Sequence, residues 1–313
     1  MPERPVTPGV QRLGILLVCY LKDDDDLPLL ELHLERVAKH TQLPTTVFVA
    51  ANRASDAARA LLGSYPDVVV CDNPDTELRG SREHGYHLDL LARQALAAGV
   101  SHLCTLDVDS FPIRDDWVDV IAAQAPTESG LAAILRVENG DVALPHPSCT
   151  FARRELFERY SPSFSPDWDG TPEFRAFLRA TGQRGDTGIR LGYTLWSNGL
   201  AWGKLLRTNA VDPHYLMAGI YGDAVFHLGG IGRGKLFRKD LEGSVRHRMT
   251  RPLERLPVGS GRAAKVKQSV LHAVRGKTED ELAAHNGVIY ARLREQLLSD
   301  PDGLIDTLRG SAG

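Results

Sequence analysis

The chain has 313 residues, of which 42% are hydrophobic and 25% are charged, and its formal net charge at pH 7 is −3. This length and composition indicate a folded protein with a sizeable core, and the small net charge gives no overall indication of a nucleic-acid partner. The charge is uneven, because residues 233–277 contain thirteen Lys and Arg against three acidic residues. Such a basic segment is usually a solvated face, although it could also contact an anionic acceptor or a membrane surface.

The four cysteines lie far apart and form no CxxC pair; they are Cys19, Cys71, Cys104 and Cys149. This spacing indicates reduced, packed thiols rather than a disulfide framework or a zinc site. The longest apolar run near the N-terminus, residues 13–21, is shorter than the ~20 residues that span a bilayer, and the first ten residues lack a signal-peptide pattern. We therefore expect a cytoplasmic protein without a transmembrane segment.

The first half of the chain alternates between apolar runs and segments with helical spacing. The apolar runs predict strands at 13–21, 45–51, 67–73 and 101–109, and the segments between them predict helices at 27–41, 55–65 and 82–99. Strands that alternate with helices imply a parallel sheet covered on both faces. Ligands of such sheets bind at the carboxyl ends of the strands.

The second half has a less regular pattern. It predicts a short helix at 115–125, a strand at 130–138, a strand passing into a helix at 146–160, a loop at 161–174, a helix starting near Asp186, and a short strand within 224–235. The tail, 278–309, is predicted to be mostly helical, with acidic residues in its first turn that suit the helix dipole.

Two aspartates, Asp107 and Asp109, end the fourth predicted strand in the run LCTLDVDSFPIRDDW. Residues two apart on a strand share a face, and two like charges on one face repel each other. The pair is either a solvated exit from the strand or a site for a cation. Mg²⁺ and Mn²⁺ take oxygen ligands and commonly keep substrate phosphates in their coordination shell. The position at the end of a buried strand favours the metal site.

The strand and helix series from 13 to 109 and the run TLDVDSFPIRDDW resemble the GT-A fold of nucleotide-sugar glycosyltransferases, most closely the family 2 type. The later segments HPSCTFARREL, GDTG and AVFHLGG fit the same resemblance, which covers about residues 13–235. It implies an α/β fold with a mostly parallel, Rossmann-like sheet flanked by helices and followed by a helical C-terminal extension.

The resemblance also implies the domains and the activity. It places a glycosyltransferase domain at 10–235, with a nucleotide-sugar half at 10–112 and an acceptor half at 113–235, and a basic, helical extension at 236–313. The implied enzyme is a metal-dependent hexosyltransferase that moves a sugar from a nucleotide-sugar to an acceptor hydroxyl, with inversion. The acceptor (a small molecule, a glycan or a lipid-linked sugar) and a homo-oligomeric state stay open.

The resemblance assigns the metal site to three residues. In this family the aspartates of the D-x-D motif contact the ribose and the metal that is bound to the donor diphosphate. Asp107 then lies on the ribose side of a Mn²⁺ or Mg²⁺ ion, and Asp109 is the main metal ligand. His227 in AVFHLGG would complete the metal shell. A buried core histidine explains His227 equally well, and His146 is a rival ligand.

An inverting transferase needs a base for the acceptor hydroxyl, and the resemblance assigns this role to Asp186 in RGDTGIRL. An N-cap role explains an aspartate at this point about as well, and a retaining mechanism stays open if Asp186 is only a cap. Asp167 and Asp169 in SPDWDG are the competing carboxylates. Trp168 between them could stack on a sugar ring or simply pack.

The sequence departs from the family at the expected contact to the nucleobase. Family members often end the second strand with an aspartate, whereas this chain has Ala51 followed by Asn52, whose amide can still bond a base edge. Asp72, after the third strand, is another candidate for the base. Arg82 in LRGSREHGY is a candidate for the nucleotide or the diphosphate. The identity of the nucleotide therefore stays open.

Three other interpretations stay open. A haloacid dehalogenase-like phosphatase also uses D-x-D, but on its first strand and with a threonine two residues later, where this chain has Phe111. A nucleotidyltransferase would bind nucleotide and metal on a similar sheet and release pyrophosphate. A non-catalytic nucleotide-sugar-binding module would bind the donor without turnover.

Overall fold

A computed structural model describes residues 10–21, 24–167, 169–230, 235–237, 240–241, 249–250, 252 and 262–311. The chain divides into two compact units. The first comprises Met1–Gly229 together with Asp300–Gly313, and the second comprises Gly230–Ser299. The last helix of the chain therefore belongs with the first unit.

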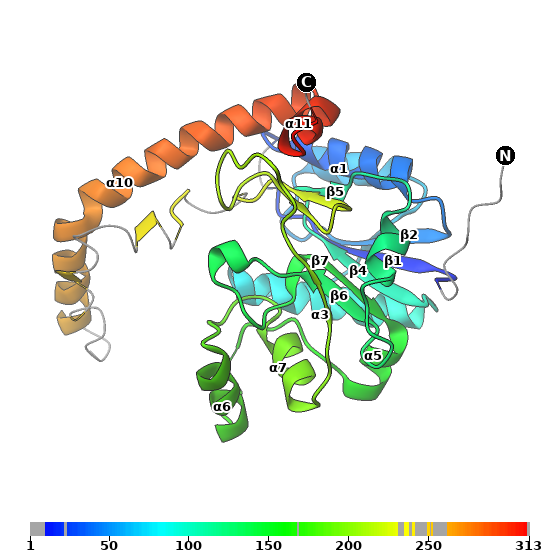
Figure 1. Ribbon diagram of the computed structural model, residues 1–313, viewed down its shortest axis with the longest axis horizontal. Coiled ribbons are helices and arrows are strands. Elements are labelled where there is room, and N and C mark those ends of the chain that lie inside the picture. The colour runs from blue at the N-terminus through cyan, green and yellow to red at the C-terminus, as the bar shows by residue number, and fades with distance from the viewer. Residues whose placement is uncertain are drawn as a thin grey trace. The chain divides into compact units, whose positions relative to one another are not determined.

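A seven-stranded sheet forms the centre of the first unit, in the order β3-β2-β1-β4-β7-β6-β8. Figure 1 labels five of its strands, β1, β2, β4, β6 and β7. The strands β1 to β4 are mutually parallel, β7 is antiparallel to both β4 and β6, and β8 is parallel to β6. Their bounds are Leu13–Val18 (β1), Thr45–Ala50 (β2), Val68–Cys71 (β3), His102–Leu106 (β4), Leu131–Ile134 (β6), His146–Arg153 (β7) and Gly203–Leu205 (β8). This confirms the predicted α/β class with a mostly parallel sheet.

Helices cover both faces of the sheet. Adjacent residues of a strand point to opposite faces, so neighbouring residues of β1 pack against different helices. Ile15 of β1 belongs to a core cluster with residues of α1, α2 and α4, whereas Leu16 belongs to a second cluster with residues of α3, α5 and α7. The helices are α1 (Leu27–His40), α2 (Asp56–Gly63), α3 (Ser81–Ala97), α4 (Trp117–Ala122), α5 (Arg154–Tyr160), α6 (Pro172–Thr181) and α7 (Ile189–Ser197). The two apolar faces explain why β1 is a continuous hydrophobic run.

A second, three-stranded antiparallel sheet lies in the same unit, in the order β5-β10-β9. Its strands are β5 (Ser110–Pro112), β9 (Gly219–Tyr221) and β10 (Val225–His227). In this sheet His227 pairs with Ser110. The pairing joins the segment that follows Asp109 to residues that come more than a hundred positions later.

Several element boundaries differ from the sequence prediction. The strand expected at 130–138 ends at Ile134, and a 3₁₀ turn follows at Val137–Asn139. The helix expected near Asp186 begins at Ile189, with Gly188 as its N-cap at a φ of 94°. A Cβ at position 188 would lie 2.4 Å from the Pro145 carbonyl oxygen, so the turn before α7 needs a glycine.

The helical C-terminal extension is confirmed as α10 (Arg262–Ser299) and α11 (Pro301–Leu308). Within the first unit, α11 buries Leu304, Ile305 and Leu308, and its Asp302 forms an ion pair with the buried Arg36 of α1 at 2.5 Å. Much of the predicted basic segment 233–277 falls outside the described residues. None of the described helices combines the length and the apolar composition needed to cross a bilayer.

Candidate functional site

Asp107 and Asp109 lie in a turn after β4 rather than on the strand itself, so the prediction that they share a strand face is wrong. Ser110 N–H donates to the Asp107 carbonyl oxygen at 2.8 Å, which closes the turn before β5 begins. Despite this, Asp107, Asp109 and His227 each offer a ligand atom, and these three atoms lie within 4.8 Å of one another. The turn brings the two carboxylates together at the carboxyl edge of the parallel strands.

The small antiparallel sheet carries His227 to this turn. Two backbone N–H groups from the segment after β10 bond to Asp109: Leu228 donates to its carbonyl oxygen at 2.9 Å, and Gly229 donates to its Oδ2 at 3.0 Å. His227 Nε2 lies 3.6 Å from Asp109 Oδ1. Gly229 has a φ of 72°, and a Cβ there would lie 2.7 Å from the Leu216 carbonyl oxygen. The glycine that follows His227 is therefore required by the backbone.

Burial favours the neutral form of His227. Only 5% of Asp109 and 7% of His227 are exposed. Burial lowers the pKa of His227, while the charges of Asp109 and Asp107 oppose that shift. His227 is therefore a neutral imidazole at pH 7, which is the form that ligates metals. Its ring centroid lies 5.9 Å from that of His146, whose Nδ1 lies 2.7 Å from Ser148 Oγ.

The donor set fits a divalent cation. Two carboxylates within 4.8 Å of each other repel, and a bound cation removes that repulsion. Carboxylate oxygens suit Mn²⁺ and Mg²⁺, and the imidazole adds a nitrogen ligand that first-row metals accept. The Gly229 N–H on Asp109 Oδ2 fixes the carboxylate in the way that outer hydrogen bonds orient metal ligands.

The first turn of α3 joins Asp186 to the cluster of Asp107, Asp109 and His227, the candidate metal-ligand cluster. His84 Nε2 of that turn lies 3.4 Å from Asp107 Oδ1, and Ser81 Oγ, from the first residue of the helix, donates to Asp186 Oδ1 at 2.7 Å. The Thr187 N–H also donates to Asp186 Oδ1, at 2.9 Å. No side chain caps α7, so Asp186 is not the helix cap that the sequence left open. Its carboxylate instead lies on the same side of α3 as Asp107.

Asn52 and Asp72 follow β2 and β3 at the same edge of the sheet. The Asn52 amide donates to the Asn73 carbonyl oxygen at 2.8 Å and to Asp75 Oδ1 at 3.1 Å. The side chain therefore bridges the ends of the two strands. Asp72 is exposed, so a nucleotide at this edge could contact it directly.

The remaining predicted residues lie around α6 and its preceding loop. Arg82 Nε donates to Asp167 Oδ1 at 2.6 Å, and the two side chains are 64% and 44% exposed. Asp169 Oδ1 accepts hydrogen bonds from the N–H and Oγ1 of Thr171, and the hydroxyl bond, the larger cause, lowers the pKa of Asp169. That makes Asp169 a poor base. Trp168 lies outside the described residues.

Arg136 and Tyr221 lie beside the cluster and carry no signal in the sequence. Arg136 Nη2, from the loop after β6, lies 3.8 Å from Asp186 Oδ2, and the Nε of the same guanidinium donates to Asp141 Oδ2 at 3.0 Å. Tyr221 OH donates to Glu138 Oε1 at 2.5 Å. The Tyr221 ring centroid is 6.4 Å from that of His227. A loop of the form RVEN looks like an ordinary solvated turn, and only the fold shows that Arg136 is buried.

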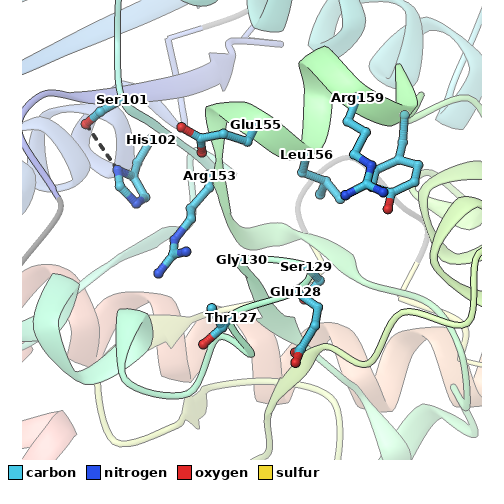
Figure 2. A pocket seen from close by; sticks show the side chains of 11 residues that line it. Ser101, His102, Thr127, Glu128, Ser129, Gly130, Arg153, Glu155, Leu156 and Arg159 are labelled. Carbon is cyan, nitrogen blue, oxygen red and sulfur yellow. Dashed lines mark hydrogen bonds between the residues drawn. The ribbon is translucent and has the colours of Figure 1, made fainter.

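A surface cavity of about 470 Å³ lies at the opposite edge of the sheet. Its lining includes His102 at the start of β4 and Arg153 at the end of the antiparallel β7, together with Glu128 and Arg159 (Figure 2). None of the predicted site residues lines it. The cavity is therefore separate from the metal-ligand cluster, which lies at the other end of β4.

No protein-family model matches the sequence, and no curated protein matches it. The structure is similar to those of several solved glycosyltransferases. One is the mannosyltransferase PcManGT from Pyrobaculum calidifontis in complex with GDP-mannose and Mn²⁺, with 14% identity and a TM-score of 0.45 over 99% of this chain and 87% of that chain.

Two further solved structures belong to galactosyltransferases. A mutant of the Drosophila β-1,4-galactosyltransferase 7, with manganese, UDP-galactose and xylobiose, has 13% identity and a TM-score of 0.38 over 71% of this chain and 72% of that chain. LgtC, with donor and acceptor sugar analogues, has 13% identity and a TM-score of 0.39 over 81% and 99%. All three identities are below 25%, so these similarities assign no activity to this chain.

Proposed function

We propose that this protein is a metal-dependent glycosyltransferase that moves a hexose from a nucleotide-sugar to an acceptor hydroxyl. The observation that carries the proposal is the convergence of Asp107, Asp109 and His227 within 4.8 Å, at the carboxyl edge of a parallel sheet where ligands of α/β folds bind. The resemblance of the sequence to GT-A transferases assigns the same three residues to a metal bound to a sugar-nucleotide diphosphate.

In this proposal Asp109 and His227 bind Mn²⁺ or Mg²⁺. Asp107 lies on the ribose side of the ion and contacts the donor ribose. A divalent cation there supplies Lewis-acid neutralisation of the departing nucleoside diphosphate. His84 lies 3.4 Å from Asp107 and orients that carboxylate. Burial of Asp109 to 5% exposure keeps water from weakening its interaction with the cation.

The nucleotide would lie along the ends of β2 and β3. Asn52 fixes the two strand ends relative to each other through its bonds to Asn73 and Asp75. The exposed Asp72 is available to the base or the ribose, and Arg82, which pairs with Asp167 at the surface, could exchange that partner for a phosphate oxygen. Phosphate is a strong partner for a guanidinium.

Asp186 is the proposed base. Its Oδ1 accepts two hydrogen bonds, from Ser81 and from the Thr187 N–H, which fix the plane of the carboxylate. Its Oδ2 lies 3.8 Å from Arg136 Nη2, beyond hydrogen-bonding distance. In this role the Asp186 carboxylate would take the acceptor proton. Proton removal by Asp186 fits inversion at the anomeric carbon.

A thermal-shift experiment tests the donor site. UDP-, GDP-, dTDP- and CDP-sugars are added with and without Mn²⁺ to the wild-type protein and to Asp109→Asn. Asp67→Asn, at an exposed site before β3, is the matched control. Donor at 100 times its Kd should stabilise the wild type and the control by about 2.7 kcal/mol, and this gain should vanish without metal or in Asp109→Asn. A well-folded wild type that no nucleotide-sugar stabilises would contradict the proposal.

Product analysis then separates the rival activities. A transferase releases nucleoside diphosphate in step with sugar transfer to an acceptor, whereas a nucleotidyltransferase releases pyrophosphate and a phosphatase releases phosphate. Binding without any product from a broad acceptor panel would favour the non-catalytic module. Loss of turnover in Asp186→Asn, with donor binding retained, would support Asp186 as the base.

A further inference from the structure

The first part of α10, residues 262–277, combines charge and apolar residues in an unusual way. These sixteen residues include five Lys and Arg and no acidic residue, and the acidic run TEDE follows at once. Positive charge is therefore concentrated in one end of a single helix that extends from Arg262 to Ser299.

The same part of the helix exposes three valines in a row. Val266, Val270 and Val274 are 59%, 43% and 39% exposed. They are spaced four residues apart, so they line one side of the helix. Leu271, by contrast, is 8% exposed, which shows that this part of the helix also has a packed side. We call Val266, Val270 and Val274 the valine row.

An apolar row within a strongly basic helix is typical of a helix that lies in the interface of an anionic membrane. The apolar side chains enter the acyl boundary, and Lys and Arg bind the acidic headgroups. The basic character also continues beyond the helix, because residues 233–277 carry thirteen Lys and Arg against three acids. Two alternatives are less favourable. A fully solvated helix would leave the valine row exposed to water, and a dimer interface would bring two strongly positive segments together.

We propose that residues 262–277 of α10 dock this protein onto membranes that contain anionic lipids, with the valine row inserted into the interface. Neither the metal-ligand cluster nor the proposed transfer reaction is needed for this docking. The partner is the lipid surface itself rather than a soluble phosphate compound.

Flotation of the full chain with lipid vesicles tests the proposal. Vesicles of phosphatidylcholine alone are compared with vesicles that also contain phosphatidylglycerol. The test variant replaces all three valines of the row by serine. Val288→Ser is the matched control, because Val288 is on the same helix and is 71% exposed, but lies beyond the basic part.

We expect the wild type and Val288→Ser to float with the anionic vesicles and not with the neutral ones, and high salt to release them. The triple serine variant should bind at least about tenfold more weakly, because it loses apolar area from the interface. If high salt abolishes vesicle binding but the triple serine variant still binds as well as the wild type, simple electrostatic adsorption explains the binding and the proposal is overturned. If the wild type does not float, and light scattering shows a wild-type dimer that the triple serine variant does not form, the valine row instead contacts a second copy of the chain and the proposal is overturned.

Discussion

His33 of α1 offers a sharp test of the structure, because it contacts the segment that follows the turn with Asp107 and Asp109, the proposed metal ligands. It is fully buried, and its Nδ1 donates to the carbonyl oxygen of Ser110 at 2.6 Å. Its Nε2 is buried and has no hydrogen-bond partner among the described residues. Protonation would place an unpaired N–H and a positive charge in the core.

Burial therefore lowers the pKa of His33 from 6.5 to about 4. Between these two values the unfolded chain binds the proton and the folded chain does not, so the free energy of unfolding falls as the pH falls. With these two pKa values, acidification from pH 7 to pH 5 should remove about 2 kcal/mol of stability through His33 alone.

The assay compares urea unfolding at pH 7 and pH 5, followed by the fluorescence of tryptophan, which includes the buried Trp117 in a core cluster of the same unit. His33→Asn keeps an N–H donor for the Ser110 carbonyl and cannot titrate. The variant should lose about 2 kcal/mol less than the wild type on acidification. His285→Asn, at an exposed position of α10, is the control. Equal losses in the wild type and His33→Asn would refute the inference that His33 is held neutral.

Three further predictions concern packing and access. Gly85→Ala should cost about 1–3 kcal/mol, because its Cβ would lie 2.7 Å from the Phe164 carbonyl oxygen, whereas Gly287→Ala meets nothing within 4 Å and should leave the melting temperature unchanged or higher; equal melting temperatures for the two would contradict the packing of α3. Ile305→Ala, at 3% exposure on α11, should cost about 2–5 kcal/mol in urea unfolding, and a cost near zero would mean that α11 does not pack as described. Iodoacetamide should label Cys71 first in the native protein, because the other three cysteines are buried; peptide mapping that finds another cysteine labelled first would be incompatible with that burial.

The sequence predicted the central sheet well because its strands are buried on two sides. Such strands are continuous apolar runs, which local pattern alone reveals. The same reasoning failed at Asp107 and Asp109, because it continued the strand to residue 109, whereas β4 ends at Leu106. The bond from the Ser110 N–H to the Asp107 carbonyl ends the strand, and no periodicity encodes it.

The convergence of His227 with the aspartates followed from the resemblance to a family and not from any local pattern. It depends on the pairing of β10 with β5, which joins segments that are far apart in the sequence. Arg136 could not be predicted for the same reason, since it approaches Asp186 from a loop that is distant in the sequence. The catalytic and binding roles of the predicted residues stay predictions until the variants are measured.

The bond from Gly229 to Asp109 joins residues that are 120 positions apart, and this separation has a consequence for biosynthesis. Contacts of long sequence separation form late in folding, and a nascent chain cannot make this one until residue 229 has left the ribosome. A chain that stops before β10 would keep the apolar strands β1 to β4 and both aspartates, yet lack the imidazole and the backbone donor that hold Asp109. The proposed metal site would therefore require a chain that extends at least to Gly229, and shorter products would bind the cation more weakly.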